Sequence, residues 1–186
     1  MSERIVAIIN DGGFEFTPEY FVALHGKLFK GVLPTAGKIR KVNIRKHEWV
    51  LKGDSVTYGA ADTIKQSLIR DFIDEREFNY GVVTPRKAIA HFARFIAQIW
   101  QVHPFGEGNT RTVAVFAVKY LASLGYRVSS NMFKDNSWFF RLFVFTPISV
   151  LIVLASLLGL VKSPTELAMT SQIRPKIQIS MCQTTR

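Results

Sequence analysis

Two apolar segments of the chain are joined by a short polar stretch, which reads Val102-His103-Pro104-Phe105-Gly106-Glu107-Gly108-Asn109-Thr110-Arg111. The first segment starts at Thr84-Pro85, because Thr can cap free backbone N–H groups and Pro at the first helical position needs none. It stops at residues 102–104, since helical geometry is disfavoured before a proline, and its wide apolar stripe predicts a central helix buried on most sides. A second apolar helix is expected over residues 110–124. The sequence therefore predicts helix, polar loop, helix.

The loop combines residue types that bind phosphate. Gly106 and Gly108 let the backbone approach a ligand closely, and the loop leads into a helix whose first N–H groups and positive dipole end attract anions. Asn109 can donate a hydrogen bond to a phosphate oxygen, and the Arg111 guanidinium offers it a planar fork. Glu107 can hold Mg²⁺, because one or two carboxylates usually bind this ion together with substrate phosphates.

A base stands at the start of the loop. His103 has an ordinary pKa of about 6.5, so its neutral imidazole can accept a proton from an attacking hydroxyl near neutral pH. A single histidine is more often a hydrogen-bonded structural residue. Because Glu107, Asn109 and Arg111 follow in the same loop, a catalytic role is the favoured interpretation of His103. Phe105 is expected to anchor the loop in the core.

The first part of the chain predicts further helices and a hairpin. Residues 5–10 have the pattern of a short strand, and Thr17-Pro18 that of a helix start, with the helix ending near residue 31. Residues 50–56 are predicted to form a hairpin with a Gly-Asp turn, and residues 60–75 a helix.

A basic cluster lies between these elements. Residues 38–46 are predicted to be a strand or an extended loop, and five of the nine are basic, namely Lys38, Arg40, Lys41, Arg45 and Lys46. Two interpretations stay open, a phosphate-binding role and a solvated basic face.

Composition narrows the class of protein. Apolar residues make up 48% of the 186-residue chain, which excludes disorder and allows a full core. A formal net charge of +10 favours anionic partners such as nucleotides, nucleic acid or acidic lipid. The single Cys182 cannot form an internal disulfide, and the N-terminal residues lack a secretory pattern, so a cytoplasmic location is expected.

The pattern His-Pro-Phe-x-Glu-Gly-Asn-x-Arg at residues 103–111 resembles the signature of the Fic (Fic/Doc) family. Residues 24–29 and 36–44 resemble the upstream helix and strand of that family, and the similarity covers about residues 16–140. The resemblance implies a mainly α fold, a Fic-type helical bundle with a small β-hairpin flap that pins an extended piece of the target protein above the site. Residues 42–57 would be that flap.

The resemblance also implies an activity. Such a protein adenylyltransferase, or AMPylator, transfers AMP from ATP to a Ser, Thr or Tyr hydroxyl of another protein or of itself. His103 would deprotonate the hydroxyl and Glu107 would hold Mg²⁺ on the α- and β-phosphates. The nucleotide and its phosphates would be bound by Gly106, Gly108, Asn109, Thr110 and Arg111. Some relatives transfer other phosphate-containing groups.

Two positions depart from the family pattern. Thr110 replaces the usual Gly, which crowds the backbone facing the phosphates but keeps the N–H available. Ala114 replaces a second Arg that holds the γ-phosphate of ATP and pairs with the Glu of an inhibitory helix. The identity of the transferred group therefore stays open. No matching inhibitory helix is found in the sequence, so inhibition by a separate protein also stays open.

The C-terminal part is unlike the family. We assign residues 1–141 to the Fic domain and residues 142–186 to an atypical tail, apolar and then basic. Residues 142–161 carry no charge and have the length of a membrane span, but Pro147 and basic residues on both flanks disfavour one. A non-native tail from a shifted reading frame is the leading interpretation, ahead of a buried core helix and a membrane segment.

A second class of function stays open beside the enzyme. In a regulatory or nucleic-acid-binding module, residues 38–46 would do the binding and the loop would no longer catalyse. The chain shows no aromatic-interleaved basic strands or recognition helix, so nucleic acid is not an expected partner. We therefore predict a Mg²⁺-dependent enzyme with a protein substrate.

Overall fold

The computed structural model describes residues 2–47 and 55–126, which are mainly α-helical, as predicted. The helices are α1 Ser2–Asn10, α2 Pro18–Phe29, α3 Ile64–Glu77, α4 Pro85–Val102 and α5 Asn109–Ser123, with a 3₁₀ turn, η2, at Tyr80–Val82. Two short antiparallel strands, β1 Arg45–His47 and β2 Ser55–Thr57, pair with Lys46 opposite Val56. The turn predicted within residues 50–56 and the tail predicted for residues 142–186 lie outside the described residues.

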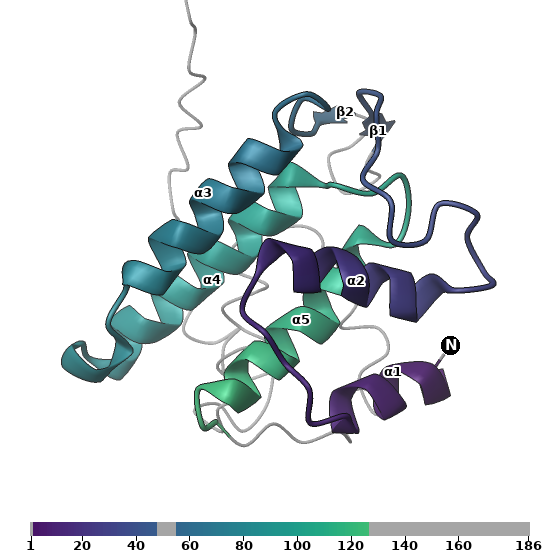
Figure 1. The fold of residues 1–186 in the computed structure, drawn as a ribbon. Coiled ribbons are helices and arrows are strands. Elements are labelled where there is room, and N and C mark those ends of the chain that lie inside the picture. The colour runs from purple at the N-terminus through teal and green to yellow at the C-terminus, as the bar shows by residue number, and fades with distance from the viewer. Residues whose placement is uncertain (1, 48–54, 127–186) are drawn as a thin grey trace, which may run out of the picture.

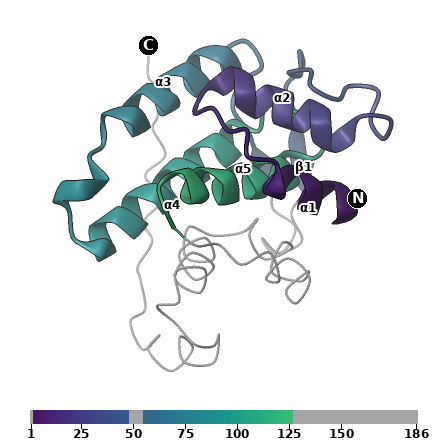
Figure 2. The ribbon, with the colours of Figure 1, turned by 60° about the horizontal axis from the view of Figure 1, so that its bottom comes forward.

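Helix α5 lies at the centre of the helical bundle. Helices α4 and α5 lie side by side, with α3 along α4 and α2 along α5, while α1 packs beside α2 and α5 (Figure 1; Figure 2). The core between them is rich in phenylalanine, and the fully buried rings are those of Phe21, Phe29, Phe72, Phe95, Phe105 and Phe116. Within the described ranges, no helix has the length and apolar character that a bilayer crossing requires.

The central helix is α5 rather than α4, which corrects the expectation for the segment after residue 84. Every residue of α5 from Thr112 to Leu121 is buried, because α1, α2 and α4 all pack against it. Helix α4 buries its apolar stripe but exposes charged residues such as Arg86 and Arg94 on its other face.

Two predicted helix starts are confirmed. The Oγ1 of Thr17 accepts a hydrogen bond from the N–H of Tyr20 at 3.0 Å, and Pro18 follows at the first helical position. Thr84 caps α4 in the same way through the N–H of Lys87. Local capping chemistry therefore fixes where α2 and α4 begin.

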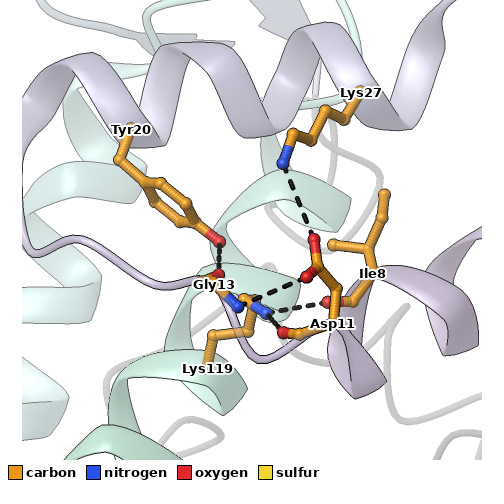
Figure 3. A network of polar contacts seen from close by, with 6 residues as sticks. All are labelled: Ile8, Asp11, Gly13, Tyr20, Lys27 and Lys119. Carbon is orange, nitrogen blue, oxygen red and sulfur yellow. Dashed lines mark hydrogen bonds and ion pairs between the residues drawn. The ribbon is translucent and has the colours of Figure 1, made fainter.

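The strand predicted for residues 5–10 is wrong, because this segment belongs to helix α1. Its β-branched residues suggested a strand, but Ile5, Ile8 and Ile9 meet the core at helical spacing. The C-terminal carbonyls of α1 are held by Lys119, whose Nζ donates to the carbonyls of Ile8, at 2.8 Å, and Asp11 (Figure 3). A cation at this end of a helix also interacts favourably with its dipole, so tertiary contacts override the local preference.

Candidate active site

The loop between α4 and α5 starts and ends in left-handed backbone. His103 is the C-cap of α4 with φ 50° and ψ 59°, and it is the one non-glycine residue with positive φ in the described ranges. Gly108, with φ 80°, is the N-cap of α5. The chain thus turns sharply after α4 and enters α5 within a few residues.

The His103 side chain is set by its neighbours. The ring is buried and stacks on Tyr58, with the centroids 3.7 Å apart and the planes 20° from parallel. Its Nδ1 lies 3.2 Å from the carbonyl oxygen of Trp100. A carbonyl oxygen only accepts, so Nδ1 carries the proton of the neutral ring and Nε2 carries the lone pair. This is the tautomer that a general base needs at Nε2.

Asn109 braces the loop. Its side chain is buried, Oδ1 accepts from the N–H of Phe105 at 2.9 Å, and Nδ2 donates to the carbonyl of Phe105 at 2.6 Å. The amide that we predicted as a phosphate donor is thus bonded to the backbone of its own loop. The Phe105 ring lies in the core, as expected.

The two glycines of the loop are not equivalent. A Cβ on Gly108 would lie 2.5 Å from two ring carbons of Phe29, and its φ already favours glycine. A Cβ on Gly106 would meet nothing within 4 Å. Phe29 therefore leaves no room for a side chain at the start of α5.

The start of α5 is suited to an anion. Gly108 has no side chain to cap the first N–H groups of α5, and such groups attract phosphate. Arg111 is exposed on the first turn, with its guanidinium carbon 4.8 Å from the Phe29 ring centroid. Thr110 accepts a hydrogen bond from the Trp100 indole at 3.3 Å, which joins the two ends of the loop.

Glu107 is exposed beside this helix start. The part of the chain that the structure describes contains no group of three or more His, Cys, Asp or Glu residues that could hold a metal ion. A magnesium ion shared with substrate phosphates needs only one or two protein carboxylates, so a single carboxylate at this place fits a substrate-borne Mg²⁺.

Sequence reasoning assigned no role to His25, which supports the loop from α2. Its Nδ1 accepts from the N–H of Gly37 at 2.8 Å, and its Nε2 donates to the carbonyl of Glu107 at 3.0 Å. The ring stacks on Phe105, with centroids 3.8 Å apart. Burial lowers the pKa of His25, and the charge of Arg111 acts in the same direction, while the hydrogen bond to Glu107 opposes them. One available signal was a histidine within the apolar stripe of a predicted helix, where a polar group needs partners.

Arg40 is the second residue whose role was missed. The interpretation of residues 38–46 as a solvated basic face is wrong for Arg40, which is buried, although Lys38, Lys41 and Arg45 are exposed. Its Nε donates to the carbonyl of His103 at 2.8 Å. Arg40 is thus part of the support of the loop and is withdrawn from any basic surface.

Comparison with known proteins identifies the family of the chain. Residues 15–121, more than half of the chain, match the model of the Fic/DOC family. The chain belongs to the Fic/DOC family.

One curated relative is "Probable protein adenylyltransferase y4lH" of Sinorhizobium fredii, which is 29% identical over 128 residues. The match covers 68% of this chain and 62% of that protein, so the chain spans less than two thirds of that relative's length.

Solved structures share the fold. The N-terminal Fic domain of a VirB-translocated Bep effector protein from Bartonella quintana aligns with a TM-score of 0.57 at 16% identity, covering 84% of this chain and 79% of that one. The corresponding domain from Bartonella sp. AR 15-3 gives 0.57 at 17%, covering 89% and 81%. A Fic family protein from Desulfovibrio desulfuricans G20 gives 0.58 at 13%, covering 92% and 54%. At such identities the likeness concerns the fold alone.

Proposed function

We propose that this chain is a protein adenylyltransferase that transfers AMP from ATP to a Ser, Thr or Tyr hydroxyl of a target protein. The observation that carries the proposal is the setting of His103, whose Nδ1 faces the Trp100 carbonyl at the entrance of an anion-binding loop. The family match and the name of the Sinorhizobium relative support the same activity.

In the proposed reaction, Nε2 of His103 takes the proton of the target hydroxyl. The hydroxyl oxygen forms a bond to the α-phosphorus, and the bond from that phosphorus to the oxygen bridging to the β-phosphate breaks. Pyrophosphate leaves and AMP stays on the target. The first N–H groups of α5 and the Arg111 guanidinium stabilise the charge that develops on the phosphate oxygens.

The remaining loop residues hold the donor. The phosphates and nucleotide are bound by the loop formed by Gly106, Gly108, Asn109, Thr110 and Arg111, in which the Asn109 amide keeps the backbone in shape through Phe105. Glu107 would hold Mg²⁺, which neutralises phosphate charge when bound.

Partners of the site are part of the proposal. An extended segment of the target protein would pair with the hairpin at residues 42–57, because an open strand edge offers backbone hydrogen bonds to a peptide. A separate inhibitor protein is a candidate partner, and the expected location is the cytoplasm.

Ala114 favours a second candidate for the donor. This residue is buried within α5, at the position where the family pattern places the second Arg. Without that guanidinium the chain has one contact fewer for a γ-phosphate, so transfer of another phosphate-containing group is the alternative.

The proposal is tested by incubating the purified chain with Mg²⁺, ATP labelled at the α-phosphate and a cell lysate, in parallel with His103→Ala. We expect labelled protein with the native chain and none with the variant, while titration calorimetry shows that both bind the nucleotide. Nucleotide binding without transfer by the native chain would contradict adenylyl transfer and direct the search to other donors.

A further inference from the structure

Both ends of the hairpin segment reach His103. Arg40 lies just before residues 42–57 and donates to the His103 backbone, while Tyr58 follows β2 and stacks on the His103 ring. Residues distant in sequence thus meet at one residue, Arg40 at its backbone and Tyr58 at its ring, and neither is part of the proposed phosphate-binding loop.

Arg40 makes an unusual set of contacts for a buried charge. The contacts found for its guanidinium are all with backbone carbonyls, those of His103 at 2.8 Å, Val42 at 2.7 Å, Val102 at 3.4 Å and Gly59. Its own N–H donates to the carbonyl of Pro104 at 2.9 Å. The fork of an arginine can reach several acceptors at once, which a lysine ammonium cannot do from one position.

The acceptors belong to two structures that the guanidinium joins. Val42 lies before strand β1 and Gly59 lies after strand β2, whereas Val102 is the last residue of α4 and His103 is the proposed base. The C-terminal carbonyls of a helix lack partners within the helix and favour a cation. The buried guanidinium therefore fastens the hairpin to the end of α4.

His103 needs such a fastening because its backbone is strained. A left-handed conformation is uncommon for a residue with a side chain, and it persists only where the surroundings enforce it. The contact of Nδ1 with the Trp100 carbonyl depends on that conformation, since His103 itself closes the last turn of α4 through its N–H to the same carbonyl at 3.1 Å.

We propose that Arg40 and Tyr58 are positioning residues, which hold the backbone and the ring of His103 in the geometry of a general base and link it to the hairpin. The inference rests on the proposed function of His103. The inference goes beyond that function because the residues at the two ends of the hairpin segment gain a role in catalysis. In the proposed function, the hairpin serves in target binding alone.

The test compares Arg40→Met and Arg40→Lys with Lys41→Met, a matched control at the exposed neighbouring position. The first measurement is the tautomer of His103 by nitrogen NMR of the four histidines, with the His103 signals assigned through their loss in His103→Gln. We expect the native chain and Lys41→Met to show the proton on Nδ1. Folded Arg40→Met should show a mixture of the two His103 tautomers. The reason is that the His103 backbone relaxes when its carbonyl loses the Arg40 donor.

His25 provides an internal control in the same spectra. It donates through Nε2 and should keep that tautomer in all variants. In the transfer assay, kcat of Arg40→Met should fall about 10²-fold, as expected for a misplaced catalytic group. The KM for the nucleotide should be nearly unchanged. The kcat of Arg40→Lys should lie between those of the native chain and Arg40→Met. Tyr58→Leu, which removes the ring that stacks on His103, should show the same two effects if Arg40→Met does not fold.

A folded Arg40→Met or Tyr58→Leu variant that keeps the native His103 tautomer would overturn the inference. If the native chain is active, a variant with the same kcat would also overturn it. If the native chain transfers nothing, the proposed function fails, but the tautomer measurement still decides whether Arg40 and Tyr58 position His103.

Discussion

His25 joins the loop between α4 and α5 to the segment that precedes the hairpin. Both ring nitrogens are used, one accepting from Gly37 and one donating to the carbonyl of Glu107. This pair of contacts exists only for the neutral ring, because a protonated His25 would direct a second N–H at the N–H of Gly37.

His25 should make stability depend on pH. Its pKa is lowered in the folded protein, mainly by burial, so below about pH 6.5 the unfolded chain binds a proton that the folded chain does not. Its contribution is therefore present above pH 6.5 and is lost as pH falls through the lowered pKa. Urea unfolding at several pH values should show the native chain losing its advantage over His25→Gln in this range. A difference that does not change with pH would contradict the assignment.

The two loop glycines should differ in their tolerance of a methyl group. Gly108→Ala places a Cβ against the Phe29 ring in left-handed backbone, and we expect a loss of about 1–3 kcal/mol in the free energy of unfolding. Gly106→Ala meets open space and should change that free energy by less than about 0.5 kcal/mol. Chemical unfolding of both variants measures the contrast, and equal losses would show that Phe29 does not restrict Gly108.

The sequence predicted loop residues that share a local motif, but not the residues that support the loop. Gly108 and Phe105 are placed as expected because the turn and the apolar anchor are local features. His25 contacts a carbonyl 82 residues away, and Arg40 contacts one 63 residues away. Such partners are set by tertiary structure, and a single sequence does not reveal them.

At the scale of the elements, α1 shows how a distant cation decides local structure. Lys119 reaches from the buried face of α5 to the last carbonyls of α1 (Figure 3). Lys27 of α2 forms an ion pair with Asp11 close by, but at 3.7 Å and with both side chains about half exposed. The first contact is buried and should be strong, whereas an exposed pair contributes little.

Removing the buried contact should release α1. We expect Lys119→Met to lower the free energy of unfolding by about 1–3 kcal/mol, because carbonyls of α1 lose their partner. Amide hydrogen exchange should quicken in α1 and stay slow in the other helices. Lys27→Met is the matched control and should leave both quantities unchanged within about 0.5 kcal/mol. Unchanged amide exchange in α1 of Lys119→Met would contradict the inference that Lys119 stabilises this helix.

Helix starts could be predicted where capping is local, as at Thr17 and Thr84. The state of residues 2–10 could not, because isoleucine and valine favour strands and the partner that stabilises the helix is on α5. The centre of the bundle was misassigned for a related reason. Two apolar helices have similar patterns, and only the packing shows that α5 is covered by α1, α2 and α4.

At the scale of the whole molecule, the end of the bundle away from the loop contains a buried carboxylate. Glu75 of α3 accepts hydrogen bonds from Tyr80 at 2.5 Å and Tyr120 at 2.8 Å. Its Oε2 lies 2.8 Å from Nε2 of His91 on α4. The cluster thus joins α3, α4 and α5 at the end opposite the proposed active site.

Glu75 should weaken the fold as pH rises. Burial raises the pKa of this carboxyl, although hydrogen bonds from the two tyrosines and the neighbouring His91 oppose the shift. Its contribution is therefore present below the ordinary pKa of about 4.5 and is lost as pH rises through the raised value. Glu75→Gln copies the neutral form and should gain stability over the native chain as pH rises in this range. Exposed Glu77→Gln is the matched control, and a Glu75→Gln profile parallel to the native one would contradict this assignment.

The fold class was implied by the resemblance of residues 103–111 to the Fic signature, and the two apolar helices predicted on either side of that polar loop are present in the structure. In the proposed function, His103 directs transfer of AMP rather than of phosphate. The most direct test supplies the chain with Mg²⁺ and ATP labelled at either the α- or the γ-phosphate, with and without His103→Ala. We expect label from the α-phosphate alone to reach protein, and only with His103 present. Label arriving from the γ-phosphate, or transfer that survives His103→Ala, would contradict it.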